Sequence, residues 1–259
     1  MLLELEQGIL YGPVNSRRYG RSLGINLMPS EYKFCSFNCV YCHYGHTRVC
    51  SMDTASQADR LPALGEVTAA LEKALRAKPK LDVITFSGNG EPTLYPQFAE
   101  LVDEVVRLRD EYLPDARLTL LSNSSGLERE AARRVLDKID LPMLKLDAGI
   151  ERTFRAVNRP CRAVSFERIV QRLIELTRKY LQTVFLDGTP SNVTDEELTA
   201  YTNLVARIKP VEVHLYSIDR PVPNIRIKLV SPERLEAIAE RIRTEAGVPA
   251  RPFNMKRKD

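Results

Sequence analysis

Short apolar segments alternate with amphipathic helical patterns along most of this 259-residue chain. The apolar segments of strand length are predicted at Ser22–Leu27, Leu81–Ser87, Arg117–Leu121, Met143–Asp147, Leu181–Leu186 and Val211–Tyr216. The helical patterns are predicted at Glu66–Ala77, Pro96–Glu111, Glu128–Lys138, Ser165–Tyr180, Thr194–Ile208 and Ser231–Ala246. Strands that alternate with helices build a parallel sheet covered by helices. The sequence therefore predicts an α/β fold with too few units for a closed barrel of eight strands.

Domain organisation follows from the same pattern. The chain contains no low-complexity segment and no stretch that resembles an inter-domain linker. Six strand–helix units are also too many for two small independent domains. We therefore predict a single domain over residues 1–259, with its core near residues 20–220, a lead-in before the core and a helix after it.

Residues that cap helices support the predicted helix boundaries. Thr194 followed by Glu197 has the spacing of a capping box at a helix start. Ser231 followed by Pro232 predicts the first turn of the last helix. Gly247 suits the left-handed position that ends this helix.

Composition places the chain in a broad class. It is 44% hydrophobic and 28% charged, which is typical of a soluble globular protein and excludes disorder as the main state. No apolar stretch approaches the roughly 20 residues of a membrane span. The first residues include acids and lack a basic region, so we expect no secretory signal and a cytoplasmic protein. An odd number of cysteines, five, fits a reducing compartment.

Polar and apolar side chains alternate along two of the predicted strands. Glu212, His214 and Tyr216 share one face of the last strand, and Lys145 and Asp147 alternate with leucines in the fourth. Because successive residues of a strand point to opposite faces, the apolar residues are expected to meet the helices. The polar residues are then expected to line a concave face that holds a substrate. An edge strand or a solvent-exposed face would show the same pattern, and His214 also fits a hydrogen-bonded interior histidine.

Three cysteines lie within eight residues, in the loop that follows the first predicted strand. Cys35, Cys39 and Cys42 form a C-x3-C-x2-C pattern. Thiolates bind soft metals, so zinc and an iron–sulfur cluster are both candidates. His46 or Cys50 is close enough in sequence to complete the four ligands of a zinc site. An iron–sulfur cube is usually held by four thiolates, so three would leave one iron open.

Two motifs resemble those of the radical S-adenosylmethionine (radical SAM) superfamily. The cysteine pattern with Tyr41 as its aromatic residue resembles the family's cluster motif. The segment Ser87–Pro92 resembles a Gly-Gly-Glu-Pro motif, although Ser-Gly-Asn-Gly precedes the glutamate. Residues 11–24, 144–148 and 216–221 resemble a subgroup related to wyosine-type tRNA modification enzymes. The resemblance implies an open, partial (βα)6 TIM-like barrel over the whole chain.

The resemblance also implies a cofactor site. Cys35, Cys39 and Cys42 would bind three irons of a [4Fe–4S] cluster, and the fourth iron would bind S-adenosyl-L-methionine. The residues implied in binding this second cofactor are Tyr41, Gly88, Asn89, Gly90, Glu91, Ser122, Asn123, Lys145 and Asp147. The segment from Gly88 to Glu91 would bind the methionyl part, Ser122 and Asn123 the carboxylate or ribose, and Lys145 and Asp147 the ribose.

Each of these assignments has a structural alternative. The glycine-rich segment also fits a tight connection between a strand and a helix. Ser122 and Asn123 also fit a turn or a helix cap. Lys145 and Asp147 also fit an internal ion pair. The sequence identifies no catalytic residue beyond the cofactor site.

The expected function is reductive cleavage of S-adenosylmethionine to a 5′-deoxyadenosyl radical, which modifies a nucleoside in tRNA. This resemblance also implies an electron donor similar to flavodoxin or ferredoxin, and no membrane partner. Arg17, Arg18 and Arg21 suit phosphate groups, although they also fit a solvated surface. One alternative is modification of a peptide or protein. Another is a zinc-stabilised nucleic-acid-binding protein without catalysis, in which His46 joins the three cysteines.

Overall fold

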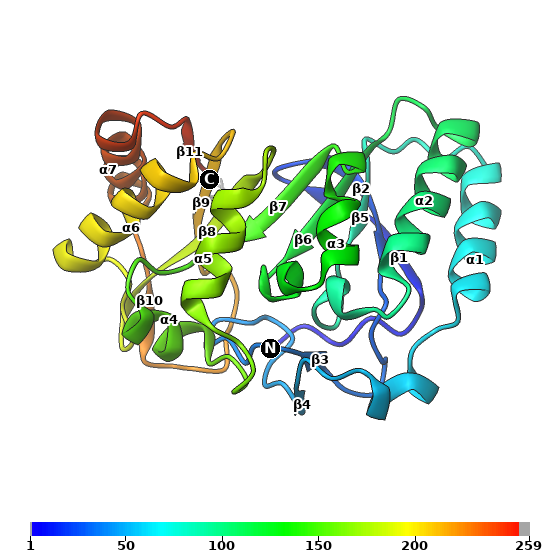
Figure 1. Cartoon of the computed structure of the whole chain (residues 1–259), viewed down its shortest axis with the longest axis horizontal. Coiled ribbons are helices and arrows are strands. Elements are labelled where there is room, and N and C mark those ends of the chain that lie inside the picture. Colours follow the sequence, from blue (N-terminus) through cyan, green and yellow to red (C-terminus); the bar gives the residue numbers. More distant parts are fainter. Residues whose placement is uncertain (1, 254–259) are drawn as a thin grey trace. The chain divides into compact units, whose positions relative to one another are not determined.

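The computed structural model describes residues 2–253 (Figure 1). These residues form two compact units. We call Glu4–Ser36 and Thr47–Met143 the N-terminal unit. Met1–Leu3, Phe37–His46 and Leu144–Asp259 form the C-terminal unit, of which Met1 and residues 254–259 lie outside the described residues. The single domain expected from the sequence stays a prediction.

Four neighbouring strands of the N-terminal unit follow the order β1-β2-β5-β6. These strands are β1 Leu10–Ser16, β2 Gly20–Ile25, β5 Val83–Phe86 and β6 Arg117–Ser122. β1 and β2 form an antiparallel hairpin, whereas β2, β5 and β6 are parallel. Thr85 of β5 pairs with Gly24 on one side and Thr119 on the other. A smaller parallel pair joins β3 Phe34–Cys35 to β4 Val49–Cys50.

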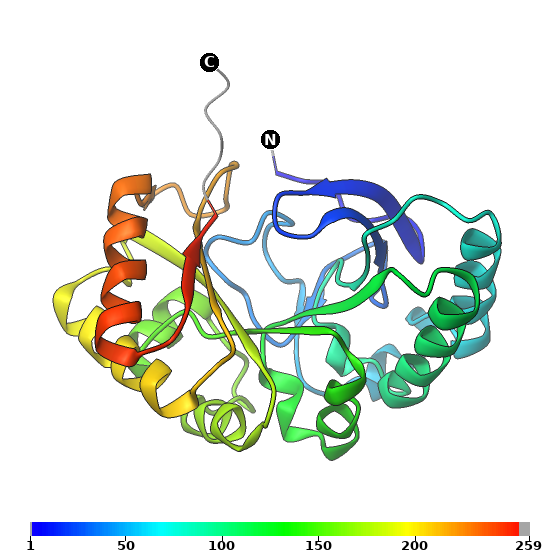
Figure 2. The same cartoon turned by 90° about the horizontal axis from the view of Figure 1, so that it is seen from above.

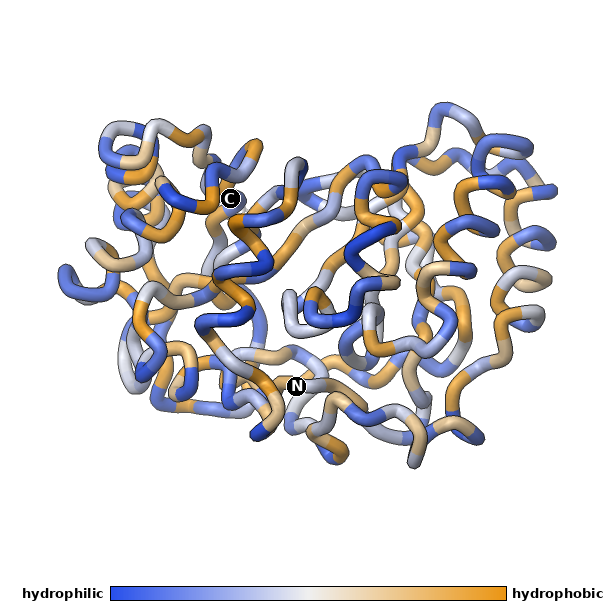
Figure 3. Tube along the Cα trace, in the orientation of Figure 1, coloured by the Kyte–Doolittle hydropathy of each residue, from blue (hydrophilic) through white to orange (hydrophobic). Residues whose placement is uncertain are grey.

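Helices cover one face of this sheet (Figure 2). They are α1 Leu64–Arg76, α2 Phe98–Tyr112 and α3 Glu130–Arg134, with 3-10 turns at Ala55–Arg60, Pro92–Leu94, Ser125–Glu128 and Leu136–Lys138. α1 shows the pattern that drives this packing. Val67, Leu71 and Leu75 recur at helical spacing and are completely buried, while the other side of the helix is hydrophilic (Figure 3). Burial of each such side chain contributes roughly 1.5–3 kcal/mol.

The C-terminal unit has its own strands, in the order β8-β9-β11. β8 Tyr180–Gly188 is parallel to β9 Val213–Ser217, which is parallel to β11 Ala250–Pro252. β10 Ile227–Leu229 pairs with β8 in the antiparallel direction. The remaining elements are α4 Glu151–Asn158, α5 Phe166–Glu175, α6 Asp195–Ile208, α7 Pro232–Arg241 and a π-helical turn at Ile242–Ala246.

The chain passes from one unit to the other within β7, Leu141–Lys145. Met143 is the last residue of the N-terminal unit in this strand, and Leu144 is the first of the C-terminal unit. The residues that follow Lys145 lead directly into the polar cluster described below. None of the helices in residues 2–253 is both long enough and apolar enough to cross a bilayer.

All six predicted strands are present, and their ends differ from the prediction by at most two residues. Two predicted helices need correction. Glu128–Lys138 is broken into short 3-10 and α-helical turns, and the helix at Ser165–Tyr180 ends at Glu175 so that β8 can begin at Tyr180. Val211 lies before β9 and is 47% exposed, since the chain has not yet reached the sheet there. The predicted elements included neither α4 nor the β1–β2 hairpin.

The predicted capping box is half wrong. Thr194 caps α6 by accepting a hydrogen bond from the Glu197 backbone N–H at 3.3 Å. The Glu197 carboxylate does not return to Thr194 but accepts from the backbone N–H groups of Gly149 and Ile150. These N–H groups lie at the start of α4, where they lack acceptors within that helix. Glu197 therefore caps a neighbouring helix.

At the last helix, both predictions are confirmed. Ser231 accepts from the Arg234 backbone N–H at 3.2 Å, with Pro232 in the first turn. Gly247 ends the helical segment in the left-handed region, with φ of 65°.

Candidate active site

In the N-terminal unit, Glu91 is a buried carboxylate at the end of the loop that follows β5. Its Oε1 accepts from the Thr93 hydroxyl at 2.5 Å, the Thr93 backbone N–H at 3.1 Å and the Ser122 hydroxyl at 2.8 Å. Its Oε2 accepts from the Asn123 backbone N–H at 2.6 Å. Burial raises the pKa of Glu91, and these hydrogen bonds offset part of that rise.

These four hydrogen bonds give Glu91 and Ser122 a structural role. A carboxylate has about four lone-pair sites, so Thr93, Ser122 and Asn123 supply as many donors as Glu91 can accommodate. The Ser122 hydroxyl also accepts from the Ser124 backbone N–H at 3.0 Å, which shapes the turn after β6. Glu91 thereby ties the loop after β5 to the end of β6. Direct contact of Glu91 with a cofactor stays a prediction.

Asn123 lies beside the first cysteine of the motif. Its Oδ1 accepts from the Ser125 backbone N–H at 2.9 Å, which fixes the orientation of the amide. Its Nδ2 donates to Ser36 Oγ at 2.8 Å and to Cys35 Sγ at 3.5 Å. The end of β6 therefore meets the cysteine loop 88 residues earlier in the chain.

The glycine-rich segment after β5 allows a close approach to the same loop. Phe34, which precedes the first cysteine, forms an isolated parallel bridge with Gly90. A Cβ atom on Gly90 would overlap the Phe34 carbonyl oxygen. Gly88 has a φ of 129°, a backbone angle that residues other than glycine rarely adopt. Gly88 and Gly90 therefore form the tight connection after a strand that was the structural alternative for this segment. Their role in binding a cofactor stays a prediction.

The side chain of Asn89 is completely buried. Its Nδ2 donates to the carbonyl oxygens of Glu6 and Pro29, both at 2.9 Å, and its Oδ1 accepts from the Glu6 backbone N–H at 2.8 Å. Its own backbone N–H donates to Asn26 Oδ1 at 3.0 Å. Asn89 therefore fastens the segment before β1 to the loop after β5.

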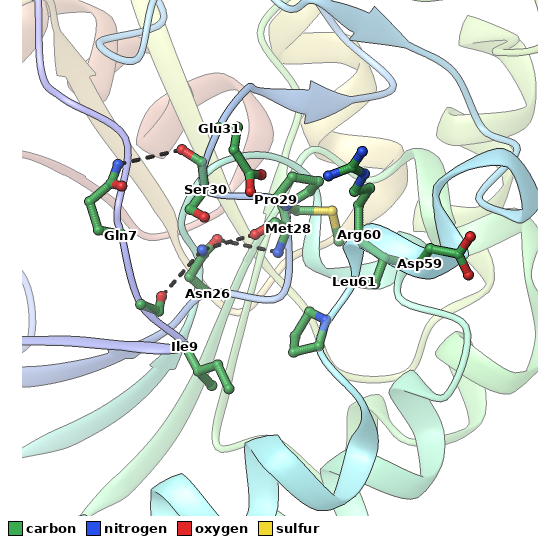
Figure 4. Close-up of a pocket in the computed structure, with 12 residues that line it drawn as sticks. Gln7, Ile9, Asn26, Met28, Pro29, Ser30, Glu31, Asp59, Arg60 and Leu61 are labelled. Atoms are coloured by element: carbon green, nitrogen blue, oxygen red, sulfur yellow. Dashed lines mark hydrogen bonds between the residues drawn. The ribbon is translucent and has the colours of Figure 1, made fainter.

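A polar cavity of about 320 Å³ lies next to these residues (Figure 4). Its walls are Gln7, Gly8, Ile9, Asn26, Met28, Pro29, Ser30, Glu31, Asp59, Arg60, Leu61 and Pro62. The Asn26 side chain in its wall is used internally, with Nδ2 donating to the Met28 carbonyl at 3.0 Å and Oδ1 accepting from the Met28 N–H at 3.3 Å. None of the predicted site residues lines this cavity.

In the C-terminal unit, Asp147 is the centre of a buried polar cluster just after β7. Its Oδ2 accepts from the Tyr41 hydroxyl and from Asn158 Nδ2, the latter at 2.6 Å. Its Oδ1 accepts from the Val184 backbone N–H at 2.8 Å and lies 3.7 Å from Lys145 Nζ. Burial and the nearby Asp147 charge raise the pKa of Tyr41 well above its usual value, so this phenol keeps its proton and donates.

Lys145 is held as a cation within this cluster. Its Nζ donates to Tyr216 Oη at 3.1 Å and lies 5.3 Å from the ring centre of Tyr41. Burial alone would lower the pKa of Lys145, but the charge of Asp147 and the contact with Tyr216 raise it overall. Lys145 and Asp147 therefore form the internal ion pair that the sequence left as an alternative, and their ribose contact stays a prediction.

Asn158 is a site residue that sequence reasoning missed. It is the last residue of α4, and its Nδ2 lies 3.5 Å from Cys39 Sγ. The backbone of the cysteine loop is fixed to the same helix end, since Asn38 N–H donates to the Asn158 carbonyl at 3.1 Å and Val40 N–H to the Val157 carbonyl at 3.0 Å. A prediction of α4 would have been needed to find this contact.

The loop between the second and third cysteines is anchored by an apolar cluster in the C-terminal unit. This cluster comprises Val40, Tyr41, Val157, Val184, Leu186 and Ile227. The Cys42 backbone N–H donates to the Cys39 carbonyl at 3.2 Å, which closes a turn between these two cysteines. No disulfide joins any of the five cysteines, all of which lie in the described part of the chain. Within residues 2–253, no three His, Cys, Asp or Glu side chains are grouped to hold a single metal ion.

His214, on the polar face of β9, is an interior residue. Its Nε2 lies 2.7 Å from Glu212 Oε2, and its ring is 4.7 Å from the ring centre of Phe253. The side chain is only 4% exposed. His214 is therefore a hydrogen-bonded interior histidine, which was one of the two expectations for it.

Comparison with known families decides the identity of this arrangement. The model of the radical SAM superfamily matches residues 32–205, which include the cysteine motif, Glu91, Asn123, Asp147 and Asn158. This chain belongs to the radical SAM superfamily. The family predicted from the two motifs is thus confirmed, and membership favours an enzyme over the non-catalytic zinc-binding alternative. Enzymes of this superfamily generally require a reductant.

Several curated proteins are similar to this radical SAM protein in sequence. A UPF0026 protein of Synechocystis sp. is 32% identical over 93% of this chain and 95% of its own length. A protein of Brachyspira hyodysenteriae named GTPase Obg is 34% identical over 88% of this chain, which spans only 32% of that relative. The S-adenosyl-L-methionine-dependent tRNA 4-demethylwyosine synthase of Arabidopsis thaliana is 29% identical over 47% of this chain and 17% of its own length.

Solved structures confirm the fold class of the radical SAM protein. A radical SAM methyltransferase from Sphaerobacter thermophilus has a TM-score of 0.61 and 18% identity over 89% of this chain and 65% of its own. A structure of TYW1 with a lysine-pyruvate adduct has a TM-score of 0.56 and 17% identity over 86% of this chain and 73% of its own. The mostly parallel strands with covering helices are therefore those of a radical SAM domain.

Proposed function

We propose that this protein reductively cleaves S-adenosylmethionine at a [4Fe–4S] cluster bound by Cys35, Cys39 and Cys42, and that the reaction modifies a nucleoside in tRNA. The observation that carries this proposal is the C-x3-C-x-Tyr-C motif inside the region that matches the family. When bound, such a cluster supplies the electron that breaks the sulfur–C5′ bond and yields methionine and a 5′-deoxyadenosyl radical.

The side chains near the motif fit a cluster of this kind. Thiolates are the usual ligands of iron–sulfur clusters, and no disulfide occupies the three sulfurs. Cys35 and Cys39 each have a buried amide N–H donor 3.5 Å from the sulfur, from Asn123 and Asn158. Hydrogen bonds of this type compensate the negative charge of metal-bound sulfur.

A buried acceptor in the C-terminal unit also suits a bound group. Asn158 Oδ1 is inaccessible to solvent and accepts no hydrogen bond from residues 2–253. A buried polar atom without a partner is costly, so a hydroxyl or ammonium donor from a bound molecule would stabilise it. Donors of both kinds are present in S-adenosylmethionine.

The chain's other residues would orient the cofactor. The backbone of Gly88, Asn89 and Gly90 can approach the methionyl ammonium closely because two of these residues lack side chains. Glu91 and Ser122 hold that loop in place. Lys145 and Asp147 are proposed to contact the ribose, with Tyr41 fixing the carboxylate of Asp147.

A tRNA substrate is supported by the exposed arginines of the β1–β2 hairpin and by the named activity of the Arabidopsis relative. Arg17 and Arg21 are exposed, and Arg18 lies 4.9 Å from the ring centre of Tyr19. Guanidinium groups can form bidentate hydrogen bonds with phosphates. We expect an electron donor similar to flavodoxin or ferredoxin.

Anaerobic reconstitution tests the cluster. Wild-type protein should bind iron and sulfide in about a four-to-four ratio and form 5′-deoxyadenosine with a reductant. Cys35→Ala, Cys39→Ala and Cys42→Ala should each lose both properties. Cys50→Ala and Cys161→Ala are matched controls outside the motif and should keep them. Equal iron content in Cys39→Ala and Cys161→Ala would show that the ligand set is wrong.

The substrate needs a separate test. Undermodified tRNA, incubated with enzyme, S-adenosylmethionine and reductant, should show a nucleoside of altered mass after digestion. The affinity of the wild-type protein for tRNA should fall steeply with added salt. At the same salt concentration, Arg17→Gln/Arg21→Gln should bind tRNA more weakly than wild type. An unchanged digest together with a salt-independent affinity would instead favour the peptide-modifying alternative.

A further inference from the structure

Two asparagine amides each lie against one cysteine sulfur of the motif. We propose that Asn123 and Asn158 tune the redox potential of the cluster, by donating N–H···S hydrogen bonds that make it easier to reduce. This inference rests on the proposed function, in which Cys35 and Cys39 are cluster ligands. The two contacts are described separately because they belong to different units of the chain.

The Asn123 contact is fixed in direction. Asn123 is 7% exposed, and its Oδ1 accepts from a backbone N–H, that of Ser125. A backbone N–H can only donate, so the atom facing Ser36 and Cys35 must be the amide nitrogen. Its two hydrogens have two acceptors, Ser36 Oγ at 2.8 Å and Cys35 Sγ at 3.5 Å.

The Asn158 contact is fixed by a different partner. Its Nδ2 lies 2.6 Å from Asp147 Oδ2, and a carboxylate of this kind accepts from the amide nitrogen. The same nitrogen lies 3.5 Å from Cys39 Sγ and 3.2 Å from Tyr41 Oη. The Tyr41 hydroxyl donates its hydrogen to Asp147, so its oxygen can accept from Asn158. All three atoms around this nitrogen are therefore acceptors. Asn158 is 1% exposed, which keeps water from replacing it.

Reduction adds negative charge that is shared by the iron and its thiolate ligands. A donor N–H stabilises the more negative state more strongly than the less negative one. The hydrogen bonds from Asn123 and Asn158 should therefore raise the reduction potential of the cluster. This brings the cluster within reach of a weaker electron donor. For this effect neither residue needs to touch the substrate, because each acts through a cysteine sulfur.

The test measures the potential of the loaded cluster by electron paramagnetic resonance during a redox titration, without S-adenosylmethionine. Asn123→Leu and Asn158→Leu keep the side-chain size and remove the donor. Each should lower the equilibrium constant for one-electron reduction about tenfold, which corresponds to 59 mV. Ser125→Ala is the control, because it removes the Ser36–Ser125 hydrogen bond of 2.6 Å and leaves both N–H···S contacts. It should change the constant by less than about twofold.

A spectroscopic measurement on wild-type protein keeps the inference testable if a leucine variant fails to fold. With ¹⁵N in asparagine side chains, the reduced cluster should show a ¹⁵N hyperfine coupling that N–H···S contact produces. Absence of that coupling, or unchanged potentials in both leucine variants at full iron loading, would overturn the inference and leave the proposed function intact. Failure of wild-type protein to assemble any cluster would overturn the proposed function itself.

Discussion

Tyr41 donates its hydroxyl hydrogen to Asp147 Oδ2, which joins the cysteine motif to the end of β7 across 106 residues of chain. Both side chains are buried, at 8% and 1% exposure. The aromatic position of the motif is therefore also a polar anchor, and Asp147 receives Tyr41, Asn158 and Val184 as donors. This network gives the first of four predictions.

Tyr41→Phe should destabilise the protein by about 1–2 kcal/mol, because it removes one donor from a buried carboxylate. Urea unfolding of the metal-free protein measures this directly. Tyr32→Phe is the control, since Tyr32 also donates to a side chain, that of Gln57, but in a half-buried position. It should cost less than about 0.5 kcal/mol. Equal losses in the two variants would contradict a structural role for the Tyr41 hydroxyl.

Glu91→Gln should destabilise the protein by about 2–3 kcal/mol, because an amide places a donor group among donors. One end of the glutamine can still accept from Thr93 and Ser122, but the other would face the Asn123 backbone N–H. Chemical denaturation of the metal-free protein provides the measurement. If stability is unchanged and only the affinity for S-adenosylmethionine falls, Glu91 acts on the cofactor and not on the loops.

Glu197→Gln should change how stability depends on pH. Burial raises the pKa of Glu197 above its usual 4.5, so the folded state binds the proton more tightly than the unfolded state. The wild-type protein therefore loses stability from this group as pH rises from about 4.5 through the raised pKa. Glutamine cannot ionise and can still accept from the backbone N–H groups of Gly149 and Ile150.

Urea unfolding of wild type and Glu197→Gln between pH 4.5 and 8 measures this effect. The variant should gain stability relative to wild type as pH rises over this range. The opposite slope would mean that the hydrogen bonds to Gly149 and Ile150 outweigh burial and favour the ionised carboxylate.

Gly90→Ala should prevent normal folding of the segment before Cys35, because its Cβ would overlap the Phe34 carbonyl oxygen. Iron incorporation after reconstitution should fall with it. Gly65→Ala is a matched control in the first turn of α1, where an added Cβ meets no atom within 4 Å. That change should stabilise the protein by roughly 0.5–1 kcal/mol. Normal iron content in Gly90→Ala would show that the loop can move away from Phe34.

Most of the regular elements could be predicted because local patterns specify them. The stripe of Val67, Leu71 and Leu75 identifies α1, and Ser231 with Pro232 identifies the start of α7. The breaks were harder to predict. α4 is only eight residues long, and its first N–H groups are capped by Glu197, which lies 47 and 48 residues later. Residues close to α4 in the sequence therefore do not reveal which side chain caps it.

The candidate site shows the same division. The cysteine spacing and the Ser87–Pro92 segment indicated the family and its chemistry, because ligand type and spacing are local properties of the chain. Which donors reach each sulfur could not be predicted, since Asn123 and Asn158 approach from elements 88 and 119 residues away.

The sequence by itself determined the strand–helix alternation, the cysteine motif and membership of the radical SAM superfamily, since these depend on residue type and on spacing along the chain. Only the tertiary structure decided that Glu91 binds two loops, that Lys145 pairs with Asp147 and that Asn158 reaches Cys39. Those outcomes depend on which polar groups are buried together. Most buried polar groups form hydrogen bonds, and the partner can lie far away in the sequence.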